Sequence, residues 1–132
     1  MSLNGGLNQL ATTIVRRDYI RELPNLRVIV RNWLNQNHPK AENIQILIKV
    51  DLTGYLTASV FFKEKIDPIL EPRLRCFWAN FNINDSGNIV QREEFGETVE
   101  SDLGHIDDTS VSRYAREEGC WELDLNKDIE EA

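Results

Sequence analysis

The chain has 132 residues, of which 41% are hydrophobic and 28% are charged, and its formal net charge is −7. This length suits one folded domain, and the composition excludes a fibrous repeat and a wholly disordered chain. No apolar run approaches the roughly 18 residues of a membrane span, and the N-terminus lacks the regions of a secretory signal. We therefore expect a single domain over 1–132, flexible at 1–6 and 128–132, in the cytoplasm and away from membranes.

The charges are unevenly distributed. Residues 1–79 contain 11 Lys/Arg and 7 Asp/Glu, a net of +4, whereas residues 80–132 contain 4 and 15, a net of −11. Because like charge repels phosphate, this asymmetry disfavours nucleic acid and favours a basic protein partner or a second copy of the chain. Alternatively, the two parts face each other, with Arg27 and Arg31 paired to the acidic C-terminal part.

Two amphipathic helices are predicted at the N-terminus. Apolar residues recur at three- and four-residue spacing over 7–20 and again after Pro24, which suits the first turn of a second helix. The second stripe consists of Leu26, Ile29, Val30, Trp33 and Leu34. This helix should end within 35–38, because Pro39 restricts the preceding residue to an extended conformation.

Alternating apolar residues then predict four strands, over 43–50, 55–62, 73–83 and 89–95. The third strand should be covered on both sides. Its two faces carry Phe77, Ala79, Phe81 and Ile83, and Leu74, Cys76 and Trp78. Leu47, Leu74, Trp78 and either Val60 or Phe61 are expected to line a half-open apolar surface on the face away from the helices.

The C-terminal third is predicted to be mostly loop after Gly96. Residues 107–110 offer N-cap oxygens for a short helix over 111–115, and Gly119 suits its end. Alternation over 121–125 predicts a half-buried strand or a docking tail. The expected fold is thus α+β: two N-terminal helices packed on an antiparallel sheet of four or five strands, a short C-terminal helix and an acidic tail.

One segment, FWANFNINDSGNIVQREEF at 77–95, fits two structures. As a helix–loop–helix it resembles an EF-hand, a resemblance that implies oxygen ligands for calcium. The candidate ligands are Asn82, Asn84, Ser86, Asn88 and Glu93. Only Glu93 would bring charge, no second loop is available to pair with this one, and the preceding segments have strand patterns. We therefore favour a β-hairpin with its turn at 85–88.

No other constellation predicts a cofactor or a reaction. His105 lies among five carboxylates that suit either an oxygen-rich metal site or a solvated loop, and we favour the loop. Cys76 and Cys120 lack metal-ligand spacing and are expected to be reduced thiols. The chain has no motif of a nucleophile, a phosphate loop or a zinc protease. A catalytic carboxylate assembled only in space, such as Asp51 or Glu64 beside a cavity, is the alternative.

The leading functional hypothesis is a non-enzymatic interaction or regulatory protein that uses its acidic C-terminal third against a basic partner or as a homodimer. The candidate partner-binding residues are Trp121, Glu122, Leu123, Asp124 and Leu125, whose alternation suits addition to a sheet edge. The second hypothesis is a small-molecule binder or an enzyme with a pocket between sheet and helices. The third is a degenerate calcium-binding module.

Overall fold

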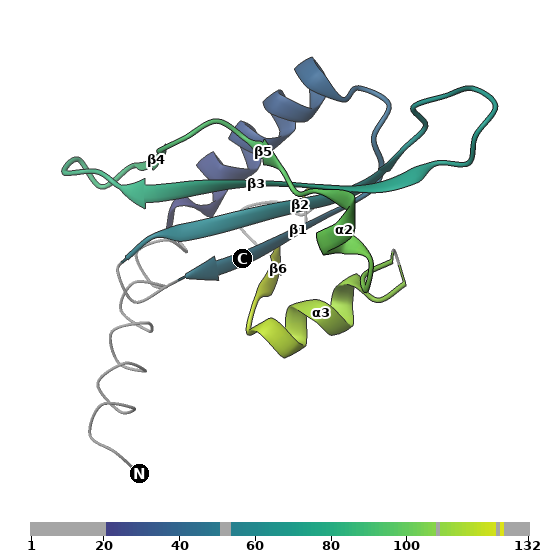
Figure 1. The fold of residues 1–132 in the computed structure, drawn as a ribbon. Coiled ribbons are helices and arrows are strands. Elements are labelled where there is room, and N and C mark those ends of the chain that lie inside the picture. The colour runs from purple at the N-terminus through teal and green to yellow at the C-terminus, as the bar shows by residue number, and fades with distance from the viewer. Residues whose placement is uncertain (1–20, 51–53, 108, 124, 126–132) are drawn as a thin grey trace, which may run out of the picture.

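The computed structural model describes residues 21–50, 54–107, 109–123 and 125. In this part of the chain an antiparallel sheet has six strands in the order β4-β3-β2-β1-β6, with β5 paired to β3. The strands are β1 Glu42–Val50, β2 Leu56–Glu64, β3 Arg73–Ile83, β4 Ile89–Gln91, β5 Gly96–Glu97 and β6 Trp121–Leu123. A helix at 21–37 lies on one side of the sheet, and α2 Glu100–Leu103 and α3 Val111–Glu118 lie on the other (Figure 1). The α+β class is therefore confirmed.

The prediction of a second helix that begins at Pro24 is wrong. The helix already includes residue 21, so Pro24 lies within it, and the helix expected over 7–20 falls outside the described residues. Leu23 and Leu26 on either side of the proline are 7% and 0% exposed. Their burial against the sheet stabilises a helix that the proline alone would interrupt. The predicted end is confirmed: the helix stops at residue 37, two positions before Pro39.

The first hydrophobic core lies between this helix and the sheet. Alternate residues of β1, β2 and β3 face the helix, as a two-residue period requires. The main buried members are Leu26, Val30 and Leu34 of the helix, Ile46 and Ile48 of β1, Val60 and Phe62 of β2, and Phe77, Ala79 and Phe81 of β3. The predicted two-faced pattern of the third strand is confirmed, since Cys76 lies in a separate core on the opposite face.

The sequence predicts a half-open apolar surface on the second face, and this is correct only in part: Leu47 and Phe61 are covered, Trp78 stays 36% exposed, and Val60 lies in the first core. Leu47 and Phe61 are 1% and 2% exposed because Leu103 of α2 and Val111 of α3 pack over them. Beyond Gly96 the segment is expected to be mostly loop, and before α3 its regular structure consists of Glu97 of β5 and the four-residue α2. Leu103 of α2 and Ile106 after it pack on this face, although their spacing defines no clear period.

The predicted fourth strand is interrupted. Gln91 of β4 pairs with Phe81, and Gly96 of β5 pairs with Trp78, so the four residues 92–95 oppose only two residues of β3, 79 and 80. The two extra residues form a bulge over 92–95. Gly96 lies against the Trp78 indole, where an added Cβ would be 3.4 Å from the ring. The bulge brings Phe95 onto Trp33 of the helix, with 4.3 Å between the ring centroids.

The short C-terminal helix is confirmed as α3. It ends at Gly119, which has a φ of 74° and donates its N–H to the carbonyl of Arg116. β6 follows and pairs with β1, with Leu123 opposite Ile46 and Trp121 opposite Ile48. The C-terminal segment thus completes the edge of the chain's own sheet.

Val30→Ala and Val28→Ala form a matched pair that tests the first core. Val30 is fully buried against the sheet, whereas Val28 is 52% exposed. Both substitutions have the same helix-propensity effect, but only Val30→Ala leaves a cavity, so it should lower the free energy of unfolding by about 2 kcal/mol. Val28→Ala should change the free energy of unfolding by no more than about 0.5 kcal/mol. Urea unfolding measures both, and equal losses would contradict the assignment of the buried face.

The two cysteines should differ in reactivity. Both are free thiols, and burial raises the pKa of Cys76 to about 11, although a hydrogen bond with Thr98 acts in the opposite direction. Only thiolate reacts, so Cys76 should be alkylated by iodoacetamide far more slowly than the part-exposed Cys120 at pH 8. The alkylation rate of Cys76 should rise about tenfold per pH unit until the pH reaches the pKa of this thiol. In denaturant the two rates should converge, and equal rates in the folded protein would contradict the second core.

Candidate functional site

Residues 77–95 form a β-hairpin, as predicted. β3 and β4 are joined by a turn in which Gly87 has a φ of 82°. The side-chain oxygen of Asn84 accepts hydrogen bonds from the backbone N–H groups of Ser86 and Asn88, at 3.0 and 2.9 Å. This candidate calcium ligand is therefore engaged in the turn itself, and no helices flank the loop. Calcium binding stays a hypothesis that this geometry does not favour.

The other candidate site residues are dispersed or contact the rest of the fold. Among the described residues no group of three or more His, Cys, Asp or Glu side chains could hold a metal ion, and His105 lies beside the ring of Tyr114. Trp121 and Leu123 pack against the first core, and the carbonyl of Leu125 accepts hydrogen bonds from Arg27 and Arg31. These arginines thus contact the C-terminal part through its backbone. Asp51 and Asp124 lie outside the described residues.

An open pocket of ≈ 430 Å³ lies where the helix ends above β3 and β4. It is lined by Trp33, Gln36, Asn37, His38, Phe77, Gln91, Glu94 and Phe95. We call it the aromatic pocket. The rings of Trp33 and Phe95 are stacked at 21°, and the ring of Phe77 lies 4.9 Å from that of Trp33. The imidazole of His38 is 4.8 Å from the Phe77 ring. Apolar ring surfaces therefore meet several polar groups in one hollow.

Glu64 holds the polar side of this pocket in place. Its Oε2 lies 2.9 Å from Nδ1 of His38, and its Oε1 accepts a hydrogen bond from Nη1 of Arg75 at 2.5 Å. Arg75 also donates from Nε and Nη2 to Oε1 of Glu97, at 2.9 and 2.7 Å. The side chains of His38, Glu64 and Arg75 are 13%, 14% and 20% exposed. We call these four residues the Glu64 network.

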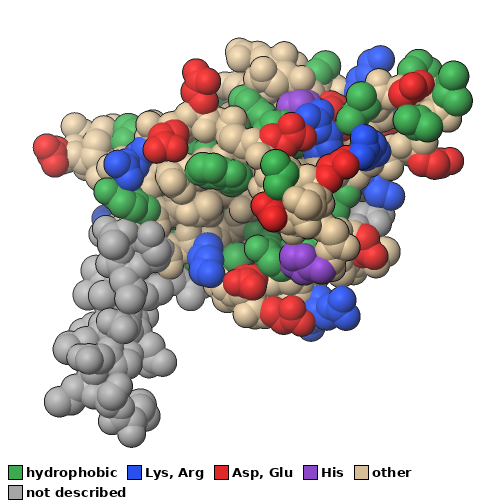
Figure 2. Space-filling model, in the orientation of Figure 1, with side chains coloured by type: hydrophobic (Ala, Val, Ile, Leu, Met, Phe, Trp, Pro, Cys, Tyr) green, Lys and Arg blue, Asp and Glu red, His purple; other side chains and the backbone are tan. Residues whose placement is uncertain are grey.

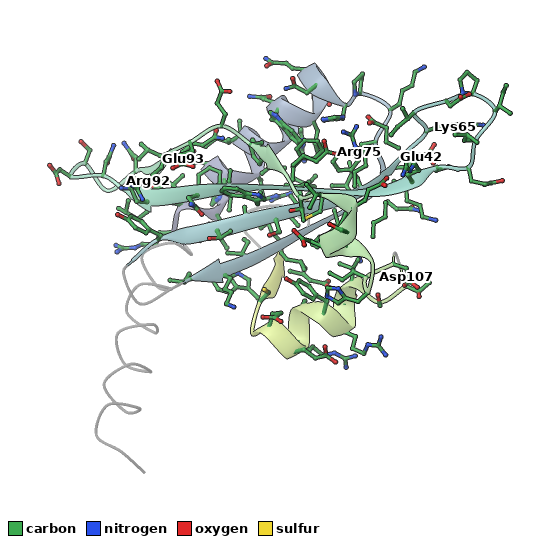
Figure 3. The ribbon with its side chains drawn as sticks, in the orientation of Figure 1. Glu42, Lys65, Arg75, Arg92, Glu93 and Asp107 are labelled. Atoms are coloured by element: carbon green, nitrogen blue, oxygen red, sulfur yellow. The ribbon has the colours of Figure 1, made fainter. Side chains whose placement is uncertain are left out.

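Strand periodicity and a helix end bring the network together. Phe62 faces the helix, so Glu64, two positions later, faces it too, and Arg75 occupies the same face two positions before Phe77. Arg75 is opposite Phe62 in the ladder, which makes it a diagonal neighbour of Glu64. His38 comes directly after the helix. Figure 3 shows Arg75 on the side of the sheet that faces the helix.

The charges of the network compensate one another. Burial disfavours the charge of Arg75, but hydrogen bonds and charge interactions with Glu97 and Glu64 outweigh that effect and raise the pKa of the guanidinium. Arg75 therefore stays charged, and two carboxylates surround it. Its guanidinium carbon also lies 5.1 Å from the centre of the Phe77 ring, within cation–π range.

Sequence reasoning found only one member of this site. Glu64 is a candidate from the sequence only as a carboxylate of the sheet that could lie beside a cavity. His38 is 26 positions earlier in the chain, and Trp33 is indistinguishable from a core residue by its spacing. Two signals were available: a histidine directly before the proline that ends a helix, and an arginine at the helix-facing position of β3.

Two other surface features stand out. The loop between β2 and β3 exposes Ile66, Ile69 and Leu70, at 59%, 90% and 56%, and Figure 2 shows hydrophobic side chains grouped at the right of that view. A second hollow of ≈ 440 Å³ lies beside the hairpin turn. Its described lining residues are Arg21, Glu22, Ile83, Ser86 and Gly87, and none of them is aromatic. Neither feature combines aromatic ring surface with an imidazole held by a carboxylate, so the aromatic pocket is the stronger candidate site.

Comparison with known proteins yields no match: no family, no characterised protein and no solved structure is similar to this chain. Within the described residues, the helices are too short or too polar to cross a membrane.

Glu64→Gln and Glu97→Gln test which carboxylate supports the network. Glu64→Gln should lower the free energy of unfolding by about 1–3 kcal/mol, because it weakens charge-assisted hydrogen bonds to both His38 and Arg75. The side chain of Glu97 is 46% exposed and hydrogen bonded to Arg75, so Glu97→Gln should lower the free energy of unfolding by less than about 1 kcal/mol. Urea unfolding at neutral pH measures both. A larger loss for Glu97→Gln would contradict the central place of Glu64.

Proposed function

We propose that this protein is a non-enzymatic binding domain and that its ligand occupies the aromatic pocket. The observation that carries the proposal is the aromatic wall of Trp33, Phe77 and Phe95 beside an imidazole fixed by Glu64. Ligand sites combine apolar surface, which supplies affinity, with a few fixed polar groups, which supply orientation. Because the His38 imidazole is already hydrogen bonded to Glu64, binding costs little ordering of this side chain.

The composition of the pocket favours binding over covalent catalysis. None of its described lining residues is Ser, Thr, Cys or Lys, and the remaining groups of nucleophilic type are the carboxylate of Glu94 and the imidazole of His38. Cys76, the buried thiol, belongs to the core on the opposite face of the sheet. The acidic C-terminal third contributes Glu94 to the pocket rim, which agrees with the hypothesis of a basic partner.

The three tryptophans provide a direct test of the site. Trp33 lines the aromatic pocket, Trp78 is 36% exposed on the other face of the sheet, and Trp121 lies at the β6 edge. Their indole N–H signals can be assigned in ¹⁵N spectra with Trp→Phe variants. When a general fragment library is added at millimolar concentration, bound fragments should shift the Trp33 signal and leave Trp78 and Trp121 in place.

The pattern of shifts distinguishes specific binding in the aromatic pocket from nonspecific stacking of fragments on exposed rings. Equal shifts at Trp33 and Trp78 would mean that fragments only stack on accessible indoles, and absence of any Trp33 shift would contradict the proposal. Ile69→Ser is the control variant, because Ile69 is 90% exposed on a loop outside the pocket. Its fragment shifts should equal those of the unmodified protein.

Acid–base catalysis is a second candidate function, favoured by the 2.9 Å contact between Nδ1 of His38 and Glu64. A carboxylate that holds one imidazole nitrogen can orient the other as a general base. The same NMR samples distinguish this function from binding. If a fragment is chemically altered by the unmodified protein but not by His38→Gln, the result would favour catalysis. If all fragments remain unaltered, the result would favour binding alone.

A further inference from the structure

We infer that the ligand of the aromatic pocket is an organic cation, a guanidinium or an ammonium group. This inference rests on the proposed function, since it names the chemistry of the group that the pocket receives. Three features of the described residues support it: the ring faces, the charge of the lining and the neutralised arginine behind it.

The aromatic wall offers π surface to a positive charge. Trp33 and Phe95 are stacked with 4.3 Å between their centroids, and Phe77 lies 4.9 Å from Trp33 at 60°. Indole and phenyl faces carry negative electrostatic potential and attract cations within about 6 Å. Arg75 already uses the Phe77 ring in this way, at 5.1 Å. Trp33 and Phe95 are half-buried at the pocket, whereas Phe77 is 8% exposed, so a cation would meet mainly the two outer rings.

The lining adds negative charge and acceptors. Glu94 is its carboxylate, and Gln36, Asn37 and Gln91 supply amide oxygens. None of the described lining residues is Lys or Arg. An anionic ligand would meet a carboxylate without a compensating cation, whereas a cation would gain an ion pair and hydrogen bonds.

The positive charge of Arg75, close to the pocket, does not reverse the preference of the pocket for a cation. Arg75 is held by Glu64 at 2.5 Å and by Glu97 at 2.7 Å, so two carboxylates offset its single charge. The carboxylates of Glu64, Glu94 and Glu97 outnumber the charge of Arg75, so the aromatic pocket and the network behind it carry a net negative charge in either protonation state of His38. The pocket is also open, so it suits the end of a side chain or a small free molecule.

A pair of isosteric probes tests the sign of the ligand charge. N-acetyl-arginine methylamide and N-acetyl-citrulline methylamide have nearly the same shape, but only the first is charged. Titration followed at the Trp33 indole N–H should give an affinity about three- to tenfold higher for the arginine probe. Free methylguanidinium in a third arm distinguishes a free cation, which would bind as well as the capped residue, from a protein side chain, which would bind less well without its backbone.

Two neighbouring glutamates provide matched variants. Glu94→Gln should reduce the preference for the arginine probe, because Glu94 is the carboxylate among the described lining residues. Glu93→Gln should preserve it, because Glu93, labelled in Figure 3, does not line the pocket. Both residues are exposed, so neither variant should disturb folding.

The possible failures are distinguishable. If the citrulline probe binds at Trp33 as tightly as the arginine probe, or if only neutral and anionic fragments bind there, the cation inference is overturned and the proposed function stands. If no probe of any charge shifts Trp33, both fail.

Discussion

The shared carboxylate of Glu64 is the constraint on which the rest of the site depends. A charged group that is only 14% exposed must be paired, because the loss of hydration would otherwise cost several kcal/mol. Its partners come from two different parts of the chain: His38 from the end of the helix and Arg75 from β3. The single carboxylate therefore fixes where the helix ends relative to the sheet, and Glu97 of β5 completes the arrangement.

The position of the helix in turn creates the aromatic pocket. The core between helix and sheet is apolar over most of its length, from Leu26 to Leu34, and the Glu64 network closes it at one end. Trp33 extends past this end, where the bulge over 92–95 places Phe95 against it. Without the two extra residues of the bulge, the β-ladder would continue and Phe95 would follow the strand. The position of the helix on the sheet and the bulge over 92–95 together form the aromatic pocket.

Local pattern predicted the elements more successfully than their assembly. The alternation within Arg73–Ile83 predicts a strand with two buried faces, and Pro39 predicts the end of the helix. Both predictions succeed because each depends only on residues that are neighbours in the sequence. The start of the helix was mispredicted, since burial of Leu23 and Leu26 overrides the proline signal. The covering of Leu47 and Phe61 by α2 and α3 could not be read from the sequence, because periodicity indicates that a face is buried and not which segment buries it. The pairing of His38 with Glu64 depends on the tertiary fold and leaves no local pattern.

The ring tautomer of His38 is the most direct test of this account. The Glu64 carboxylate, paired with Arg75, can only accept a hydrogen bond, so a neutral His38 must carry its proton on Nδ1, which leaves the lone pair of Nε2 free. Long-range ¹H–¹⁵N correlation spectra of the imidazole, recorded at alkaline pH, identify the protonated nitrogen. The account predicts the Nδ1–H tautomer. A dominant Nε2–H tautomer would contradict the shared carboxylate and the pocket geometry that depends on it.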